Sequence, residues 1–394
     1  MQGALAGLKV LDLSRYIAGP YCGMLLGDMG ADVIKIETPE KGENTRAFHP
    51  RVADSSLYTM VFNRNKRSMT LNFRHPEAQA VLRDLMQQAD VVIENFLPGT
   101  LEKMGCGWDV VSKLNPRLIM TRISGFGASG PYSNEPCFDM IAQAMSGIMD
   151  LTGQPDGPPT MAGTFVADYS TALYAAIGTM GALQSRERTG AGQIVETTLL
   201  SSSLSLLVTA IPKFMLFGQG TTRNGNRDRF VAPSNTFPTA DGDWVILQAP
   251  EDKFKFLAAG MGRNDLAIDP RFATNAARLE NVEALEQEIA AWTSTQSTDA
   301  VLAMLKEGRI PSAKVATIAD VVNNPQVQHN GNIIWTKHGE HDVPMQGFTV
   351  NFSETPMALQ RSCPGIGEHT EEILSEWLNL SSSDAQRLRV AKAI

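Results

Sequence analysis

The first third of the chain alternates between short apolar runs and longer stretches in which apolar residues recur every three or four positions. Short apolar runs are typical of buried strands, and the longer stretches predict helices. Strands are expected at residues 8–13, 33–37, 90–94 and 118–123, with helices at 17–28, 76–88 and 101–114. Because strands that alternate with helices usually form a parallel sheet, the pattern predicts a Rossmann-like open α/β sheet.

The pattern becomes mostly helical beyond residue 138 and then changes again. Helices are expected at 138–147 and 168–186, a strand at 194–197, and one long helix at 199–217. Residues 218–229 are polar, basic and rich in glycine, as linkers are. The expected organisation is a large domain begun by residues 1–217, a linker at 218–229, a smaller α+β domain at 230–310, and a return to the large domain at 311–394.

Composition and charge place the chain among ordinary globular proteins. Of its 394 residues 43% are hydrophobic and 19% are charged, and the formal net charge is −8. This acidic balance gives no general attraction for nucleic acid or an anionic membrane. No apolar run approaches the ~18–20 residues of a membrane span, and no signal peptide is expected. The four scattered cysteines and six histidines favour a cytoplasmic protein without disulfides or a metal site.

One segment departs from the acidic balance. Residues 35–74 contain eight basic and four acidic residues, which leaves this segment at +4. Such a segment suits an anionic ligand, although a solvated surface has the same composition. Beyond it, Arg223, Arg227 and Arg229 could pair with a carboxylate of a substrate or simply lie in a solvated linker.

Asp168 is the carboxylate with the most informative position. It follows residues 163–167 at the start of an expected helix of small residues. An acid at a helix N-terminus is usually a cap. However, the positive end of the helix also stabilises an ionised carboxylate, and an oriented, desolvated carboxylate can act as a covalent nucleophile. Composition alone leaves both roles open.

Ordered landmarks lie along almost the whole chain. They include L-x-G-x-x-V-L-D at residues 5–12, E-N-F-L-P-G at 94–99, G-F-G at 125–127, A-D at 167–168 and P-G-I-G-E-H-T at 364–370. In these motifs the chain resembles the class III CoA-transferases (CaiB/BaiF family), the group of formyl-CoA transferase and the carnitine CoA-transferases. The resemblance implies an enzyme that moves CoA between carboxylic acids, with acyl-CoA as a substrate and no tightly bound cofactor.

The resemblance also implies a role for Asp168, which matches the family's nucleophilic aspartate. That residue attacks an acyl-CoA thioester and forms an aspartyl acyl anhydride and CoA thiolate. The thiolate returns to form an aspartyl-CoA thioester, and the acceptor carboxylate takes CoA through a second anhydride. The residues that the resemblance places against CoA are Ile17, Ala18, Leu71, Asn72, Phe73, Arg74, Asn95, Phe96, Leu97, Lys103, Cys137 and Asp139.

The resemblance implies an interlocked homodimer, and it gives the positive segment at 35–74 a reason to attract the phosphates of CoA. Three positions depart from formyl-CoA transferase. Thr38 and Pro136 stand where that enzyme has an arginine and a lysine, and Asp139 replaces a glutamate. These departures weaken an oxalate or formate specificity, and a small dicarboxylate such as succinate is favoured as one partner.

Two alternatives remain open. The related α-methylacyl-CoA racemases need a catalytic histidine just before the acid at position 139, where this chain has Phe138, so proton exchange at an α-carbon is less well supported. The second alternative is a CoA-binding subunit without catalysis in a heteromeric transferase, and the presence of Asp168 argues against it. The expected partners are therefore acyl-CoA and a small carboxylic acid, without nucleic acid or membrane.

Overall fold

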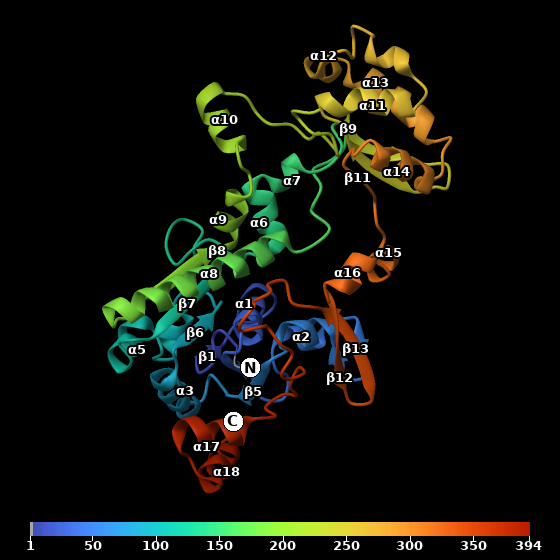
Figure 1. Cartoon of the computed structure of the whole chain (residues 1–394). Coiled ribbons are helices and arrows are strands. Elements are labelled where there is room, and N and C mark those ends of the chain that lie inside the picture. Colours follow the sequence, from blue (N-terminus) through green and yellow to red (C-terminus); the bar gives the residue numbers. More distant parts are fainter. Residues whose placement is uncertain (1–2) are drawn as a thin grey trace. The chain divides into compact units, whose positions relative to one another are not determined.

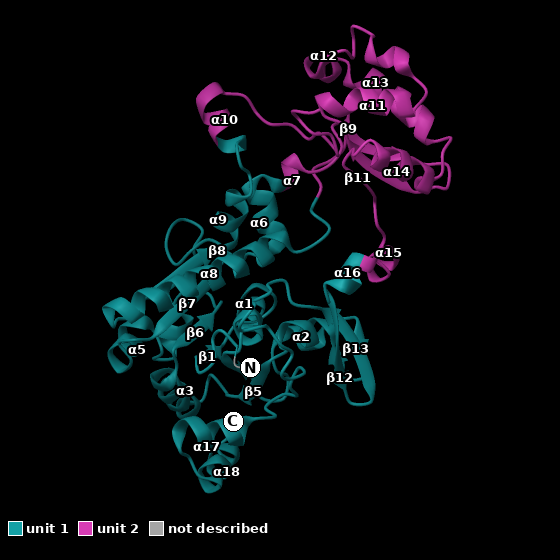
Figure 2. Cartoon of the chain, in the orientation of Figure 1, with its two compact units in different colours: residues 1–148, 161–211, 326–394 teal, residues 149–160, 212–325 magenta. Residues whose placement is uncertain are grey.

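The computed structural model describes residues 3–394, which form two compact units (Figure 2). Unit 1 runs from the start of the described chain to Ile148 and includes residues 161–211 and 326–394. Unit 2 comprises residues 149–160 and 212–325. Each unit has its own hydrophobic core, so each is described separately.

A six-stranded sheet forms the centre of unit 1 (Figure 1). All its strands run parallel, in the order β5-β2-β1-β6-β7-β8. Their bounds are β1 Lys9–Asp12, β2 Asp32–Glu37, β5 Lys66–Thr70, β6 Val91–Glu94, β7 Ile119–Ser124 and β8 Ile194–Thr198. Side chains alternate between the two faces, so that Val10 and Leu11 enter different hydrophobic clusters. A sheet that is apolar on both faces needs helices on both.

Helices do cover both faces. On one face lie α1 (Ala18–Asp28), α6 (Asp139–Ser146), α8 (Val166–Thr189) and α9 (Leu199–Ser205). On the other face lie α3 (Pro76–Gln88), α5 (Trp108–Leu114), α17 (Thr370–Leu378) and α18 (Ser382–Val390). The buried positions of α8 are mostly alanine and threonine, which allow a close approach to the sheet and to α1. This packing fixes the position of the N-terminus of α8 within unit 1.

The other elements of unit 1, and those that cross its borders, are short. Their bounds are η1 Asn44–Ala47, β3 Arg51–Val52, β4 Ser55–Ser56, α2 Leu57–Phe62, α4 Thr100–Lys103, α7 Ile148–Leu151, α10 Ala210–Phe217, α16 Pro325–His329, β12 Ile333–His338 and β13 His341–Gln346. The β12–β13 hairpin buries Val343 and Met345 against Met60 of α2. In this way the C-terminal part of the chain completes unit 1.

Unit 2 is built around a three-stranded antiparallel sheet in the order β11-β10-β9. Its elements are β9 Ser234–Pro238, β10 Trp244–Gln248, α11 Glu251–Gly260, η2 Asn264–Ala267, α12 Asn275–Glu280, α13 Val282–Thr293, α14 Thr298–Glu307, β11 Ser312–Lys314 and α15 Ile318–Val322. Alternate strand residues such as Val245 and Leu247 pack against helix residues such as Phe254 and Leu285. The unit is therefore a small α+β fold with one covered sheet face.

The predicted fold class, an open parallel α/β sheet with a smaller α+β part, is confirmed. Strand β5 was not predicted, because its sequence Lys-Arg-Ser-Met-Thr suggests an exposed segment. In the structure Lys66 is fully buried and pairs with Asp12, so internal ion pairing conceals the strand. The division also differs from the expected boundaries at three places. Residues 212–217 belong to unit 2 instead of the large domain. Residues 149–160 join unit 2 through the Arg223–Asp150 ion pair, and residues 311–325 join it through β11.

The expectation of one long helix at 199–217 is wrong. The helix breaks into α9 and α10, bent by 77°, and Val208 between them has a positive φ of 48°. The expected helix at 101–114 also breaks, where Gly105 adopts a φ of +65°. Among the described helices none is by itself long and apolar enough to cross a membrane, and α9 with α10 passes such a test only as a bent pair.

Candidate active site

The N-terminus of α8 brings two carboxylates together in unit 1. Asp168 lies in the first turn of α8, and Asp139 begins α6. Asp139 Oδ1 accepts hydrogen bonds from the backbone N–H of Ala167 (2.8 Å) and of Asp168 (3.1 Å). The side chain that satisfies the free N–H groups of α8 is therefore Asp139. The structure contradicts the view of Asp168 as the cap of its own helix, since its carboxylate makes no such bond.

Asp139 is itself held in place by Gln143, one helical turn further along α6. The Gln143 side chain is fully buried, and its Nε2 donates to Asp139 Oδ2 at 2.5 Å. Its Oε1 accepts from the backbone N–H of Ala162 at 3.0 Å, which ties the segment before α8 to α6. Gln143 was not predicted as a site residue, and its spacing of four residues from Asp139 on one helix is the signal that could have identified it.

The Asp168 carboxylate makes no hydrogen bond or ion pair with any residue of the described range 3–394. Burial, with the nearby negative charge of Asp139 as a second cause, raises the pKa of Asp168 to about 7. A carboxylate with such a pKa is more basic than usual and still about half ionised at neutral pH. Such a pKa suits a nucleophile. At neutral pH enough of the carboxylate is ionised to attack, and its raised basicity keeps the ionised form reactive.

Cys137 lies in the same neighbourhood. Burial, Asp168 and Asp139 raise the pKa of the Cys137 thiol to about 11, so the thiol stays protonated. The Cβ of Cys137 also lies very close to Gly125. A Cβ added at position 125 would be only 2.2 Å from the Cys137 Cβ. The glycine after β7 therefore allows the Cys137 segment to pass close to that strand end, next to the two carboxylates.

Aromatic side chains extend from this site. The Tyr169 ring packs against Tyr21 at 4.6 Å between centroids, and Phe138 meets Tyr16 edge-on at 5.4 Å. Phe138 is 53% exposed and carries no group that can transfer a proton. Phe138 stands where the resemblance places the racemase histidine, so that position lacks the base that racemisation needs.

The residues predicted to contact CoA come mainly from loops at the carboxyl ends of β1, β5 and β6. In parallel sheets this edge is where ligands bind. Asn95 clamps the loop after β1, since its Oδ1 accepts from Arg15 N (2.8 Å) and its Nδ2 donates to Arg15 O (2.7 Å). Phe96 packs edge-on against Phe73 at 6.0 Å between ring centroids. The structure thus brings Asn95, Phe96 and Phe73 together with Arg15, which was not predicted.

The remaining predicted contacts differ in exposure. Ile17, Ala18 and Leu71 are buried, and Leu71 belongs to the sheet core, so only its backbone remains available to a ligand. Leu97, Arg74 and Lys103 are exposed, and Asn72 is partly buried with its Nδ2 bonded to Lys392 O. Exposed side chains at this edge remain candidates for contact, whereas the buried ones shape the loops.

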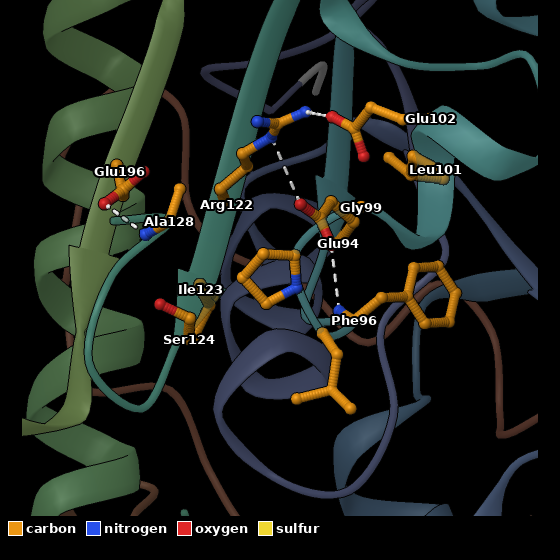
Figure 3. Close-up of a pocket in the computed structure, with 12 residues that line it drawn as sticks. Glu94, Phe96, Gly99, Leu101, Glu102, Arg122, Ile123, Ser124, Ala128 and Glu196 are labelled. Carbon is orange, nitrogen blue, oxygen red and sulfur yellow. Dashed lines mark hydrogen bonds and ion pairs between the residues drawn. The ribbon is translucent and has the colours of Figure 1, made fainter. Parts of the chain in front are cut away.

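A pocket of about 300 Å³ opens at this edge. It is lined by Arg15, Ile36, Glu37, Thr38, Lys41, Gly42, Glu43, Asn44, Ala47 and Phe73, and is called the Arg15 pocket below. A second pocket of about 250 Å³ lies nearby along the edge and is called the Glu94 pocket (Figure 3). Its charged residues are Glu94, Glu102, Glu196 and Arg122.

The two pockets differ in charge. In the Glu94 pocket, Arg122 is shared between Glu94 (3.3 Å) and Glu102 (2.9 Å), which leaves an excess of negative charge (Figure 3). Burial raises the pKa of Glu94 to about 7. The Arg15 pocket has two cations, Arg15 and Lys41. Of its two acids, Glu37 is bound by Arg46 at 2.6 Å, so the cations outnumber the acids that have no ion pair. Only the Arg15 pocket is therefore suited to an anion.

Most of the positive segment at 35–74 is not available to an anionic ligand, and that expectation is wrong for five of its eight cations. Each of the five forms an ion pair inside unit 1 with carboxylates of the same unit, namely Lys35, Arg46, Arg64, Lys66 and Arg67. Burial in the low-dielectric interior requires such pairing, so their charge is cancelled within the fold. Lys41, Arg51 and Arg74 remain without an ion pair within residues 3–394, and Arg51 donates to the backbone carbonyl of Asp54.

The arginines within the expected linker are also engaged. Arg223 pairs with Asp150 at 2.9 Å, and Arg227 pairs with Glu286 at 2.7 Å. Arg229 donates to the carbonyl of Thr222. These contacts within unit 2 leave little support for pairing with a substrate carboxylate. In the described chain no three histidine, cysteine or acidic side chains are grouped as metal ligands would be.

Comparison with known proteins decides the family. A sequence profile of CoA-transferase family III matches residues 5–370. The chain belongs to this family. It is 40% identical to the succinyl-CoA–D-citramalate CoA-transferase of Chloroflexus aurantiacus, over 99% of this chain and 98% of that protein. It is 38% identical to the succinyl-CoA:mesaconate CoA-transferase of Haloarcula hispanica, over 95% of this chain and 96% of that protein.

A solved structure supports the same assignment. A CaiB/BaiF family protein from Brucella suis superposes with a TM-score of 0.88 and 37% sequence identity, over 96% of this chain and 100% of that one. The predicted family, fold and enzyme class are confirmed. The chain is a family III CoA-transferase, an enzyme that moves CoA between carboxylic acids.

Proposed function

We propose that this enzyme transfers CoA from succinyl-CoA to a small dicarboxylic acid, with Asp168 as the covalent nucleophile. The observation that carries the proposal is the Asp168 carboxylate, which is partly buried, has no partner within residues 3–394, and lies at the positive end of α8. Relatives across the full length of the chain are named for succinyl-CoA and dicarboxylic acids, which supports this choice of substrates.

The reaction proceeds by exchange of acyl groups on Asp168. A carboxylate oxygen attacks the thioester carbonyl, the C–S bond breaks, and CoA thiolate leaves an aspartyl succinyl anhydride. The thiolate attacks the Asp168 side-chain carbonyl, which releases succinate and forms an aspartyl-CoA thioester. The acceptor carboxylate then displaces the thiolate and forms a second anhydride. Attack of the thiolate on the acceptor's carbonyl yields the new acyl-CoA and frees Asp168.

Asp139 has two effects on these steps. Its hydrogen bonds to the first turn of α8 fix the position of Asp168. Its charge repels the ionised Asp168 carboxylate, and this repulsion disappears when Asp168 becomes part of a neutral anhydride or thioester. The neighbouring charge therefore disfavours the free nucleophile relative to the covalent intermediates.

The assembly proposed for this enzyme is an interlocked homodimer in the cytoplasm. Several large apolar side chains on the outer surfaces of α6 and α8 are exposed, among them Met140, Leu173, Tyr174 and Ile177. An apolar surface of this kind is typical of a subunit interface. All four cysteines are free, as expected in a reducing compartment. Light scattering on the purified protein tests the assembly, and a mass of one chain excludes it.

Mass spectrometry tests the role of Asp168. The enzyme is incubated with succinyl-CoA without an acceptor, and proteolysis then locates a CoA adduct on the peptide that contains Asp168. The Asp168→Asn variant is expected to give no adduct, whereas Asp84→Asn, a change at an exposed position on α3, leaves it unaffected. An adduct elsewhere, or none together with full transfer activity, excludes Asp168 as the nucleophile.

A further inference from the structure

We propose that Gln143 is a positioning residue for the nucleophile: its neutral amide fixes Asp139, and through Asp139 the first turn of α8, without cancelling the negative charge of Asp139. This role rests on the proposed function, in which Asp168 is the attacking group. The bonds of the amide, its place in the chain and its lack of charge each support the role.

The side chain of Gln143 uses its whole hydrogen-bonding capacity within unit 1. It is fully buried on α6, and an amide has two N–H donors and one carbonyl acceptor. Nε2 donates to Asp139 Oδ2 at 2.5 Å and to the backbone carbonyl of Thr164 at 3.4 Å. Oε1 accepts from the backbone N–H of Ala162 at 3.0 Å. The reverse orientation of the amide would set its oxygen against a carboxylate, so the contacts themselves fix which atom is which.

These bonds connect α6 to the segment that leads into α8. The chain returns from unit 2 to unit 1 at residue 161, and the amide of Gln143 then holds both ends of residues 162–164. The other oxygen of Asp139 holds the backbone of residues 167–168 in the same way. The two helices also pack against each other (Figure 1). The amide and the carboxylate together therefore set where α8 begins.

The amide leaves the charge of Asp139 in place. Asp139 forms no ion pair with any residue of the described range, and its donors are one amide and two backbone N–H groups. By contrast, Asp12 is held by Lys35 and Lys66, which cancel its charge. A neutral donor orients a carboxylate without neutralising it, so the negative charge still acts on its neighbours. Asp139 therefore stays fixed and still raises the pKa of Asp168.

Asp139 supplies the charge that acts on Asp168. Two other titratable side chains interact with Asp168, those of Cys137 and Tyr169. Burial raises the pKa of both, so both are uncharged at neutral pH. No cation in the described part of the chain forms an ion pair with Asp168. Any change that moves Asp139 or alters its charge is therefore expected to change the reactivity of Asp168.

Replacement of the amide separates positioning from a purely structural role. Gln143→Met keeps the length of the side chain and removes its hydrogen bonds. It is expected to lower kcat for CoA transfer about tenfold or more while KM for succinyl-CoA stays within about twofold of wild type, because the nucleophile is misplaced and the thioester contacts are untouched. Thr179→Val is the matched control. It removes a buried hydrogen bond to Thr121 further along α8 and should lower Tm but leave kcat within about twofold of wild type.

Gln143→Glu supplies a readout in pH. While the introduced carboxyl group is protonated, it donates to Asp139 and accepts from Ala162, so the arrangement is kept. When it ionises, two carboxylates face each other at hydrogen-bond distance and repel. The ratio of kcat in this variant to kcat in wild type is therefore expected to be highest near about pH 6 and to fall about tenfold by about pH 9. The same ratio for Thr179→Val should stay constant.

Circular dichroism verifies that each variant is folded at the pH of measurement. If Gln143→Met does not fold, the pH dependence of Gln143→Glu is the remaining test, because that variant keeps the contacts in acid. A folded Gln143→Met enzyme with normal kcat, or a Gln143→Glu ratio that stays constant with pH, overturns the role of Gln143. The CoA adduct on Asp168 of the wild-type enzyme tests the proposed function separately. An adduct on Asp168 together with normal turnover in the Gln143 variants contradicts the positioning role alone.

Discussion

Two aspartates of unit 1, the fully buried Asp12 and the partly buried Asp168, have opposite environments. Asp12 ends β1 and lies 2.7 Å from Lys66 Nζ and 3.5 Å from Lys35 Nζ, and it also accepts bonds from Ser14. Burial alone raises the pKa of Asp12, but the two lysines outweigh it and lower that pKa to about 2. Asp168 has no such partner, and its pKa is raised to about 7.

The difference separates a structural carboxylate from the proposed nucleophile. Asp12 is neutralised by cations from β2 and β5, so it links three neighbouring strands and has no free lone pair for chemistry. Asp168 has no cationic partner and lies beside a second acid, Asp139. This arrangement costs stability, but it leaves the Asp168 carboxylate free to react. A buried acid in this fold is therefore interpreted from its partners, because burial alone does not distinguish the two roles.

The largest expected effect follows from removing the unpaired carboxylate. Asp168→Asn is expected to lower CoA transfer about a thousandfold or more while the fold remains intact, because the amide cannot form the anhydride. Asp12→Asn is expected to behave in the opposite way, with a destabilised fold and no loss of the reacting group. Transfer rates with circular dichroism check both variants. A folded Asp168→Asn enzyme with normal turnover contradicts the comparison.

The next effect concerns the paired carboxylate. Lys66→Met is expected to lower the free energy of unfolding by about 3–5 kcal/mol, because it leaves Asp12 buried with an incomplete set of partners. Lys113→Met, at an exposed position on α5, is the matched control and is expected to change stability by no more than about 0.5 kcal/mol. Urea denaturation measures both. If the two variants were equally stable, the Asp12 network would not be structural.

The same two aspartates show how much the sequence could predict. The strands β1, β2, β6 and β7 and the candidate nucleophile were predicted, since apolar runs and a recognisable family pattern mark them. Strand β5 was not predicted, because the charged residues Lys66 and Arg67 indicate an exposed segment in the pattern of hydrophobic and polar positions. Their burial depends on Asp12 and Asp32, which lie more than thirty residues away and are brought close only by the parallel pairing.

The site shows the same limit. The sequence singled out Asp168 as the candidate nucleophile, but the acid that caps α8 comes from α6, and no local rule connects positions 139 and 168. Likewise, the positive segment at 35–74 had the composition of an anion site. In the structure five of its eight cations are already paired with carboxylates, which a charge count along the sequence does not record. The sequence therefore predicted most strands of the sheet and a candidate nucleophile, and the fold decided which charges are free.

A third and smaller effect sharpens the comparison through pH. Transfer is expected to increase as pH rises through about 7, because burial and Asp139 raise the pKa of Asp168 and only its ionised form attacks. Asp139→Asn removes the neighbouring charge and should shift this rise to lower pH, while retaining an oxygen for the N-terminus of α8. A profile of kcat/KM from about pH 5 to pH 9 measures the shift. An unchanged midpoint would mean that burial alone sets the pKa.

The smallest expected effect is on thermal stability, and its sign distinguishes the two aspartates. Folded Asp168 holds its proton up to about pH 7, whereas the unfolded chain releases it near the ordinary value of 3.8. The folded state therefore loses stability relative to the unfolded state as pH rises between these values. Asp168→Asn lacks this cost, so its Tm should exceed that of wild type by a few degrees at about pH 8 and by much less at about pH 5. Asp12, with its lowered pKa, contributes its full stabilisation at both pH values and loses it only in stronger acid. Scanning calorimetry at the two pH values measures the difference, and a Tm advantage that does not grow with pH would show that Asp168 is not an uncompensated acid.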